Sequence, residues 1–227
     1  MREIVLDTET TGLDPREDRI VEIGAVELVN HLRTGEDFHV YINPGRPMPE
    51  EAFRIHGLGD AFLADKPSFR AIADRFLAFI GEAPLVIHNA AFDMGMINGE
   101  FARLGLPLLP DARAVDTVTI ARKRFPGAQA SLDALCKRFG VDASARVKHG
   151  ALLDSELLAD VYLELLGGRQ QGLTLDNGAG RGGSKTIQTH GPRERRAPLA
   201  PRLTEEERAA HAAFVESLGE GALWRRS

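Results

Sequence analysis

In three separate segments of this sequence, an acidic residue occupies a position whose neighbours predict burial in an apolar interior. The first is a strand pattern from Glu3 to Leu6 that runs directly into Asp7 and Glu9, and strand alternation points these two carboxylates to the same side. Like charges on one face repel, so the arrangement is costly unless a cation lies between them. The alternative for this pair is a solvated strand-to-turn junction, because residues 10–15 are turn-like.

The second and third acids each begin the apolar stripe of an amphipathic helix. Asp93 is followed at helical spacing by a set of apolar residues: Met96, Ile97, Phe101 and Leu104. Asp154 is followed in the same way by Leu157, Leu158, Val161 and Leu165. An aspartate near a helix N-terminus also interacts favourably with the helix dipole, which is the structural alternative. Three independent segments with an inward acid nevertheless predict one site for a hard cation, since burying several like charges without a counter-ion is expensive.

The ligand chemistry of these acids favours one kind of metal and one kind of reaction. Carboxylate oxygens suit Mg²⁺ or Mn²⁺, whereas zinc prefers His and Cys, and the single cysteine, Cys136, leaves no pair at zinc spacing. Two hard cations close together support phosphodiester hydrolysis, because they stabilise both the attacking and the leaving oxygen. His149 lies five residues before Asp154 and outside its helix, so we expect it to act as general base on the attacking water.

The order of hydrophobic patterns in residues 1–168 predicts an α/β domain with a mixed sheet of about five strands and helices on its faces. Alternating patterns predict an antiparallel meander of strands at Glu3–Leu6, Ile20–Val29 and Phe38–Ile42, and a buried strand at 85–87. Helical periodicity predicts helices at Phe69–Ile80, 90–104, 117–124, 131–139 and 150–166. Asn89 is suited to cap the second of these helices.

Composition separates a second part of the chain from this domain. Residues 167–202 hold 8 glycines and 3 prolines with almost no large apolar residues, which is typical of a flexible linker. Thr204 followed by Glu207 is a capping-box pattern that predicts a short helix to about Leu218. We therefore expect a domain at 1–168, a linker at 169–203 and a short helical tail at 204–227.

Charge and targeting signals restrict the class of protein further. The net charge is −5, and residues 1–169 hold 19 Lys and Arg against 26 Asp and Glu. Since sequence-independent grip on DNA comes from basic side chains, such a domain would hold DNA weakly, with bound cations bridging its carboxylates to phosphate. The sequence lacks both a long apolar run and an export signal at its start, so we expect a cytoplasmic protein without membrane segments.

The acidic segments resemble the three exonuclease motifs of the DEDDh family. Asp7 and Glu9 lie in DTETTG, Asp93 in HNAAFD, and His149 with Asp154 in HGALLD. Further segments are similar, in the same order, to the proofreading epsilon subunits of bacterial DNA polymerase III: EIGAVELVN, HVYIN, HGL, RFPG, SLDALC and ALWRRS. The resemblance covers nearly the whole chain and implies a 3′-to-5′ DNA exonuclease with a ribonuclease H-like fold, which releases nucleoside 5′-monophosphates.

The resemblance also implies a role for each motif residue. Asp7 would bridge two divalent cations, Mg²⁺ or Mn²⁺. Glu9 and Asp154 would help to hold the ion that activates the water, and Asp93 would hold the second ion, partly through water. His149 would be the general base.

Five further positions lie, in relatives, beside the terminal nucleotide of a single-stranded or frayed DNA 3′ end: Thr8, Thr10, His56, Asn89 and Phe92. Threonines near a turn and an asparagine at a helix start also have ordinary structural uses. These five residues are therefore expected nucleotide contacts that the sequence alone does not distinguish from structural ones.

Two segments beyond the domain resemble partner-binding elements. Residues 170–175 are similar to the peptide that binds the beta sliding clamp, through Gln170, Leu173 and Leu175. This pattern is short and also occurs by chance, but here it stands at the head of the predicted linker. The tail at 204–227 is similar to a segment that binds the polymerase alpha subunit, with an apolar set that suits an interface: Phe214, Leu218, Leu223 and Trp224.

Two other functions share parts of this pattern. A free-standing DEDDh relative that trims RNA ends would have nearly the same motifs, but it has no evident need for the linker, the clamp-like peptide and the tail. A noncatalytic adaptor that joins polymerase and clamp would keep the tail, but it has no need for all five motif residues. The proofreading exonuclease accounts for both parts of the chain.

Overall fold

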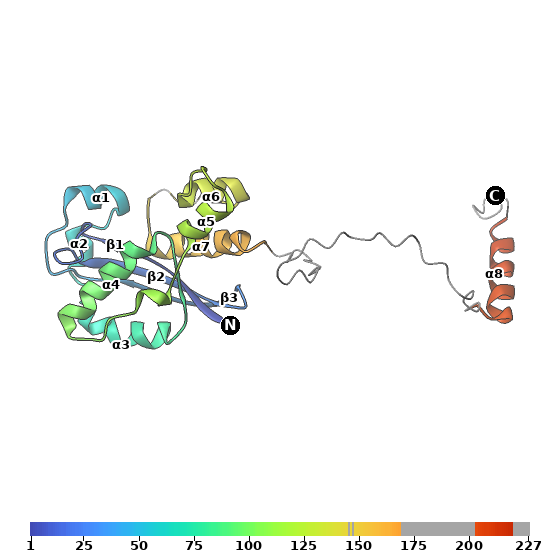
Figure 1. Cartoon of the computed structure of the whole chain (residues 1–227), viewed down its shortest axis with the longest axis horizontal. Helices are drawn as coiled ribbons and strands as arrows, with labels where there is room; N and C mark the ends of the chain where they lie inside the picture. Colours follow the sequence, from blue (N-terminus) through green and yellow to red (C-terminus); the bar gives the residue numbers. More distant parts are fainter. Residues whose placement is uncertain (145, 147, 169–202, 220–227) are drawn as a thin grey trace, which may run out of the picture. The chain divides into compact units, whose positions relative to one another are not determined.

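The structure, a computed structural model, describes residues 1–144, 146, 148–168 and 203–219. These residues fall into two units, one that holds β1 to α7 and one that holds α8 (Figure 1). The elements of the first unit are β1 (Arg2–Thr10), β2 (Ile20–Val29), β3 (Leu32–Tyr41), α1 (Glu50–His56), α2 (Asp60–Leu63), α3 (Phe69–Ile80), β4 (Leu85–Ile87), α4 (Ala90–Leu104), η1 (Asp111–Arg113), β5 (Ala114–Asp116), α5 (Thr117–Arg124), α6 (Leu132–Phe139) and α7 (Ala151–Leu165). The second unit holds α8 (Glu205–Ser217).

The five strands form one mixed sheet in the order β3-β2-β1-β4-β5. β1, β2 and β3 pair antiparallel, as the meander prediction requires, while β4 and β5 join parallel to β1. The β2–β3 connection is a two-residue turn in which Asn30 and His31 both have positive φ, 52° and 64°, which matches the twist of a tight hairpin. The prediction of an α/β domain with a mixed sheet of about five strands is confirmed.

Helices cover both faces of this sheet, and each face has its own hydrophobic core (Figure 1). On one face, Ile4 and Leu6 of β1 pack with α3 and α4. On the other face, Val5 packs with α5, α6 and α7. Because side chains alternate along a strand, Asp7 and Glu9 share the side of Val5 and lie toward α7.

Helix α7 approaches the sheet very closely at Gly24 of β2, the residue that pairs with Asp7 in the register of the two strands. The Ser155 hydroxyl donates a hydrogen bond of 2.8 Å to the Gly24 carbonyl oxygen. A Cβ at Gly24 would lie 2.1 Å from the carbonyl carbon of Ala151, which is backbone and cannot move aside alone. The missing side chain of Gly24 therefore lets the first turn of α7, including Asp154, lie against the acidic end of β1.

Most predicted elements are confirmed at or near their predicted bounds. β2, α3, α4 and α5 begin and end where the hydrophobic periods placed them. α6 begins one residue later than predicted, and α7 is one residue shorter at each end. β1 continues to Thr10, so the two acids lie inside the strand rather than after it. β3 begins at Leu32 and not at the predicted Phe38. The first six residues of β3 are all exposed and show no alternation, so the hydrophobic pattern did not indicate them.

Four short elements have no counterpart in the sequence prediction: α1, α2, η1 and β5. The longest of them has only 7 residues. Elements this short contain too few residues to show a recognisable hydrophobic period. β5 is the fifth strand that the prediction expected without locating it. It forms because it adds in parallel to β4, a contact that local sequence does not encode.

The capping role predicted for Asn89 is wrong. Asn89 does precede α4, but it has φ 66° and ψ 54°, and its side chain makes no capping hydrogen bond. Its backbone N–H instead donates to Asp116 Oδ1 at 3.1 Å. Asparagine tolerates this left-handed conformation better than most residues, so Asn89 serves the sharp turn between β4 and α4.

Helix α8 in the second unit has the predicted capping box. The Thr204 hydroxyl accepts a hydrogen bond from the Glu207 N–H, and the Glu207 carboxylate accepts one from the Thr204 N–H at 2.9 Å. All residues of α8 are at least partly exposed, including Phe214. Among the residues that the structure describes, no helix is both long and apolar enough to span a membrane.

Gly24→Ala tests the close approach of α7 to the sheet. We expect the free energy of unfolding to fall by roughly 1–3 kcal/mol or more, because the added methyl would overlap the α7 backbone. Urea unfolding of the variant measures the loss. Gly150→Ala is the matched control, since a Cβ there would meet no atom within 4 Å, and it should lose less than about 1 kcal/mol. Equal stability of Gly24→Ala and the original chain would contradict this packing.

Candidate active site

Asp7 and Glu9 provide the first two carboxylates of the site, at the carboxyl end of β1. Asp7 is half-buried and Glu9 is 9% exposed. Glu9 lies directly opposite Glu22 of β2, whose buried carboxylate lies 2.7 Å from Nε2 of His39. The strand therefore presents two acids on one side, with a third acid beside them.

Asp93 reaches the same strand end from the other face of the sheet. It lies in the first turn of α4 and is only 3% exposed. Its Oδ1 accepts hydrogen bonds from the Thr8 N–H, at 3.1 Å, and from the Thr8 hydroxyl, at 2.7 Å. Thr8 thus fixes the Asp93 carboxylate at the end of β1.

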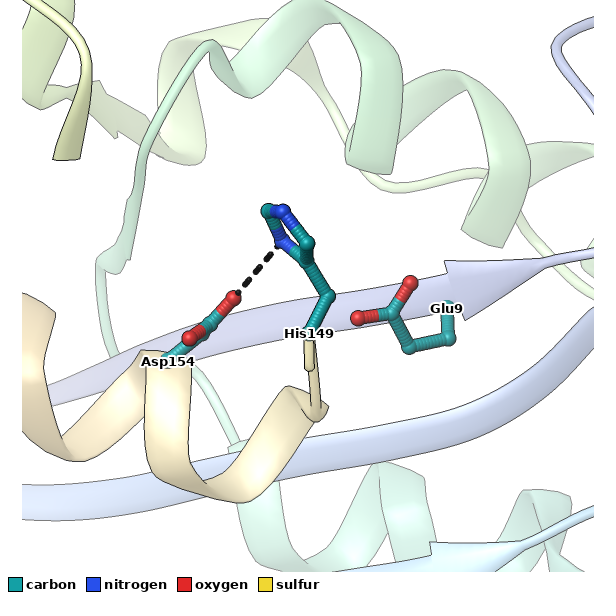
Figure 2. Close-up of side chains that lie close together, drawn as sticks. All are labelled: Glu9, His149 and Asp154. Carbon is teal, nitrogen blue, oxygen red and sulfur yellow. Dashed lines mark ion pairs between the residues drawn. The ribbon is translucent and has the colours of Figure 1, made fainter. Parts of the chain in front are cut away.

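Asp154 and His149 come from the start of α7 and the segment before it (Figure 2). Asp154 is 3% exposed, whereas the His149 ring is largely accessible, and its Nδ1 lies 3.2 Å from Asp154 Oδ2. Ligand atoms of Glu9, His149 and Asp154 all lie within 4.8 Å of one another. The structure therefore brings together residues that are 140 positions or more apart in the sequence.

Arg146 adds a cation that the sequence analysis did not single out. Its Nε donates to Asp154 Oδ1 at 2.6 Å and its Nη2 donates to Asp154 Oδ2 at 2.7 Å. Nη2 also lies 2.8 Å from His149 Nδ1, and Nη1 forms an ion pair with Asp133. One guanidinium thus joins α6, α7 and the predicted general base.

Burial and mutual repulsion make these acids unusually weak. Burial raises the pKa of Asp7 well above its ordinary value, and the charges of Asp93, Glu9 and Asp154 raise it further. The pKa of Glu9 is raised to about 8, first by burial and then by the charge of Glu22. Burial likewise raises the pKa of Asp93 to about 7, against the hydrogen bonds from Thr8 that lower it. Arg146 opposes these shifts for Asp7 and Glu9, but it does not cancel them.

All five motif residues line one cavity of about 290 Å³: Asp7, Glu9, Asp93, His149 and Asp154. Four carboxylates around one space offer oxygen ligands only, which is the donor set that hard divalent cations prefer. Burial raises the pKa of three of them, Asp7, Glu9 and Asp93, and neighbouring acids raise it further at Asp7 and Glu9, so the charged forms lack a sufficient counter-ion. The residues present therefore fit a site for divalent metal ions.

The expected nucleotide contacts fall partly in this cavity and partly beside it. Thr8 and Phe92 line the acidic cavity. Thr10, His56 and Phe92 line a second cavity of about 310 Å³, which shares Thr8 and Glu9 with the first. Burial lowers the pKa of His56, so its ring is neutral over a wider pH range. Asn89 is exposed and is not among the residues that line either cavity.

Sequence reasoning missed four titratable residues that lie at or beside the site: Glu22, His88, Asp133 and Arg146. Glu22 stands between Val21 and Ile23 in β2, and an acid inside this apolar strand was the available signal. His88 and Asp133 line the acidic cavity, but single polar residues beside a strand or a helix start carry no distinguishing pattern. Arg146 lies in a segment without regular structure, so only the fold reveals its partners.

The partner-binding residues predicted beyond the domain are only partly described. Phe214 of α8 is 59% exposed, and Leu218, the first residue after α8, is also exposed. Gln170, Leu173 and Leu175, like Leu223 and Trp224, lie outside the described residues.

Known proteins similar to this chain are nucleases and a polymerase subunit. The profile of the Exonuclease family matches residues 4–162. The chain is 50% identical over 223 residues to the DNA polymerase III subunit epsilon of Rickettsia felis, across 96% of this chain and 97% of that one.

Solved structures with the same fold include two nucleases. Exonuclease X in complex with 5′ overhanging duplex DNA is 26% identical, with a TM-score of 0.56 across 72% of this chain and 90% of that one. The nuclease domain of 3′hExo, a DEDDh family member bound to rAMP, has a TM-score of 0.63 across 73% and 91% of the two chains. At 18% identity, the second likeness concerns the fold alone.

The raised pKa values predict how stability depends on pH. A carboxyl whose pKa is raised by folding binds its proton more tightly in the folded state, so its contribution is full below the unfolded pKa and is lost as pH rises through the folded pKa. Without divalent cations, we expect stability to fall as pH rises from about 4.5 to about 8, by a few kcal/mol in all. Added Mg²⁺ should restore the stability at pH 8.

Asp7→Asn should flatten this pH dependence and stabilise the metal-free chain at pH 8, because it removes one of the mutually repelling charges. Urea unfolding in EDTA at pH 5 and pH 8 measures both effects. Asp74→Asn, on the exposed side of α3, is the control and should leave the slope unchanged. A metal-free stability that does not change between the two pH values would show that these acids do not repel as described.

Proposed function

The chain belongs to the Exonuclease family and, within it, to the epsilon subunits of bacterial DNA polymerase III, and on that premise we propose that its acidic cavity hydrolyses the terminal phosphodiester at DNA 3′ ends during proofreading. The observation that carries this proposal is the convergence of four carboxylates and one histidine on a single cavity at the end of β1. The products would be nucleoside 5′-monophosphates, released one at a time.

We propose that two divalent cations, Mg²⁺ or Mn²⁺, bind to these carboxylates. The charges of Asp93, Glu9 and Asp154 all act on Asp7, which would contact both ions. Glu9 and Asp154 would hold one ion, and Asp93 would hold the other. When bound, such ions activate a water and stabilise the charge that develops on the attacking and leaving oxygens.

The protein's own residues orient the acids and move the proton. Thr8 holds the Asp93 carboxylate through two hydrogen bonds, so that its second oxygen is free for a ligand. The His149 ring is accessible from the cavity and, in its neutral form, has one ring nitrogen that can accept the proton of the attacking water. Imidazole side chains can take up and release a proton near neutral pH, which suits a general base.

The second cavity, beside the acids, fits the terminal nucleotide. Its lining combines apolar side chains, among them Leu13, Ile55 and Phe92, with polar ones, among them Thr10 and His56. Phe92 borders both cavities, so a base that stacks on its ring would place the adjoining phosphate near Asp7 and Glu9. We infer that Thr8, Thr10, His56 and Phe92 contact the nucleotide, whereas Asn89, the fifth predicted contact, lines neither cavity.

We further propose that the chain works in the cytoplasm as part of the polymerase, with the domain at 1–168 tethered by residues 169–203. A tether explains how an acidic domain can act on DNA, because a flexible chain of about 35 residues spans roughly 30–35 Å and can give an effective concentration near millimolar. The anchor would be the tail at 204–227, which binds the alpha subunit, while residues 170–175 bind the beta sliding clamp.

His149→Ala tests the catalytic assignment. With Mg²⁺ and a mismatched primer–template, the original chain should shorten the primer from its 3′ end, and the variant should turn over roughly 10²–10⁴ times more slowly. Isothermal titration should find metal binding largely kept. His211→Ala on α8 is the matched control and should hydrolyse at the normal rate.

The same assay separates this proposal from its competitors. Normal specific activity of His149→Ala with a lower melting temperature would make the histidine structural. Faster shortening of an RNA primer than of DNA would favour a free-standing exoribonuclease, and no turnover by the original chain would favour an adaptor.

Replacement of Gln170, Leu173 and Leu175 by alanine should weaken binding to the bacterial sliding clamp without changing hydrolysis of a free oligonucleotide, since these residues lie outside the predicted catalytic domain. Titration against purified clamp measures the affinity. A variant with Leu32, which is exposed in the catalytic unit, changed to alanine is the control for loss of an apolar side chain. If the triple variant bound the clamp with unchanged affinity, residues 170–175 would not be a clamp-binding motif.

Deletion of residues 204–227 should leave hydrolysis of short single strands unchanged, but it should abolish co-purification with the alpha subunit and slow mismatch removal during synthesis. The tail is too small to fold alone, and exposed Phe214 and Leu218 suit folding on a partner. Phe214→Ala should weaken the association more than Leu108→Ala, an equally exposed change in the catalytic unit. Full affinity of the truncated chain for alpha would place the anchor elsewhere.

A further inference from the structure

The guanidinium of Arg146 lies inside the proposed metal site, and its side chain is only 10% exposed. It takes both oxygens of Asp154 in a bidentate contact, at 2.6 and 2.7 Å, and its third nitrogen pairs with Asp133 at the rim. Such a fork is the strongest contact that an arginine makes with a carboxylate. Arg146 is therefore the counter-ion of Asp154 in the arrangement that the structure describes.

This contact conflicts with metal binding at Asp154. A divalent cation on either oxygen of Asp154 would lie within a few ångströms of the guanidinium, in a largely buried place where like charges repel strongly. The Glu9 oxygen that would share such a cation lies within 4.8 Å of an Asp154 oxygen. Arg146 in its present position and a metal ion at Asp154 therefore exclude one another.

The same guanidinium decides which nitrogen of His149 carries the proton. Arginine can only donate hydrogen bonds, so His149 Nδ1, at 2.8 Å from Nη2, must be the acceptor. An ion pair between Nδ1 and Asp154 Oδ2, at 3.2 Å, would require a proton on Nδ1 and is incompatible with that bond. We assign the hydrogen bond from Arg146, because it is the shorter of the two contacts and its donor is always charged. The proton then lies on Nε2, and neither ring nitrogen is free to accept one from water.

We propose that Arg146 is a positioning residue that serves as internal counter-ion while divalent cations are absent, and that cation binding at Asp154 displaces its guanidinium and frees His149 Nδ1. The proposal rests on the metal-dependent function proposed above and goes beyond it. Asp133, which is 72% exposed on α6, can keep the displaced guanidinium at the rim of the cavity. Cation binding therefore also releases His149 to act as the base. Without cations, the His149 Nδ1 atom stays hydrogen-bonded to Arg146.

Arg146→Gln in the full-length chain tests the competition. The variant should bind Mn²⁺ with a Kd lower by about tenfold or more, because no charged hydrogen bonds are lost on binding. Its melting temperature should fall in EDTA but stay near the original value in saturating Mn²⁺. Calorimetric titration and thermal unfolding measure the two effects. Equal or weaker Mn²⁺ binding by the folded variant would overturn the proposal.

Arg124→Gln is the matched control, because Arg124 also holds α7, through carbonyl oxygens of Glu164 and Leu165 at its far end. Its melting temperature should fall equally with and without Mn²⁺, and its Kd should not change. A Kd change equal to that of Arg146→Gln would make the effect one of helix stability and would refute a specific role.

The ¹⁵N chemical shifts of the His149 ring distinguish this proposal from a purely structural role of Arg146, which would not change them. In the metal-free original chain, Nδ1 should have the shift of a hydrogen-bonded acceptor, and Mg²⁺ should move it toward the value found in metal-free Arg146→Gln. Identical His149 spectra of the two metal-free proteins would overturn the release of the base. Failure of both proteins to bind Mn²⁺ would instead refute the metal-dependent function, and the proposal with it.

Discussion

Repulsion among buried carboxylates at the end of β1 is the constraint on which the rest of the structure depends. Asp7, Glu9, Asp93 and Asp154 line one cavity, and burial raises the pKa of three of them, to about 8 for Glu9 and about 7 for Asp93. A fold selected only for stability would not gather these charges, since each costs free energy without a counter-ion. The cluster is therefore held against its own electrostatics by the packing around it, and cations are what make it useful.

Three features of the fold supply that packing. The strand β1 lies at the centre of the sheet, with a separate hydrophobic core on each face, so acids can approach its end from both sides. On one side Thr8 fixes Asp93 of α4, and on the other Gly24 lets α7 bring Asp154 against the strand. Arg146 then balances part of the charge through Asp154. The contacts at Thr8 and Gly24 join residues that are 85 or more positions apart in the sequence, whereas Arg146 and Asp154 are only 8 apart.

Much of this architecture follows from the sequence because the relevant patterns are long. The apolar residues that follow Asp93 and Asp154 at helical spacing predicted both helices and the burial of both acids. In the fold, each of these two acids is 3% exposed. What the sequence could not supply depends on contacts between segments. β5 exists only because β4 accepts it, and the partners of Arg146 are set by where α6 and α7 meet. Asn89 was misread for a related reason, because an asparagine before a helix serves equally as a cap or in a left-handed turn.

The central claim is that these four carboxylates hold two divalent cations, and anomalous scattering from crystals soaked in Mn²⁺ with a nucleoside 5′-monophosphate tests it most directly. We expect two peaks in the cavity, both within about 2.0–2.5 Å of Asp7 oxygens, the range for oxygen ligands of such ions. One peak should adjoin Glu9 and Asp154, with the Arg146 guanidinium withdrawn from it, and the other should adjoin Asp93. A cavity without peaks at saturating Mn²⁺, or peaks that contact none of these acids, would contradict the account.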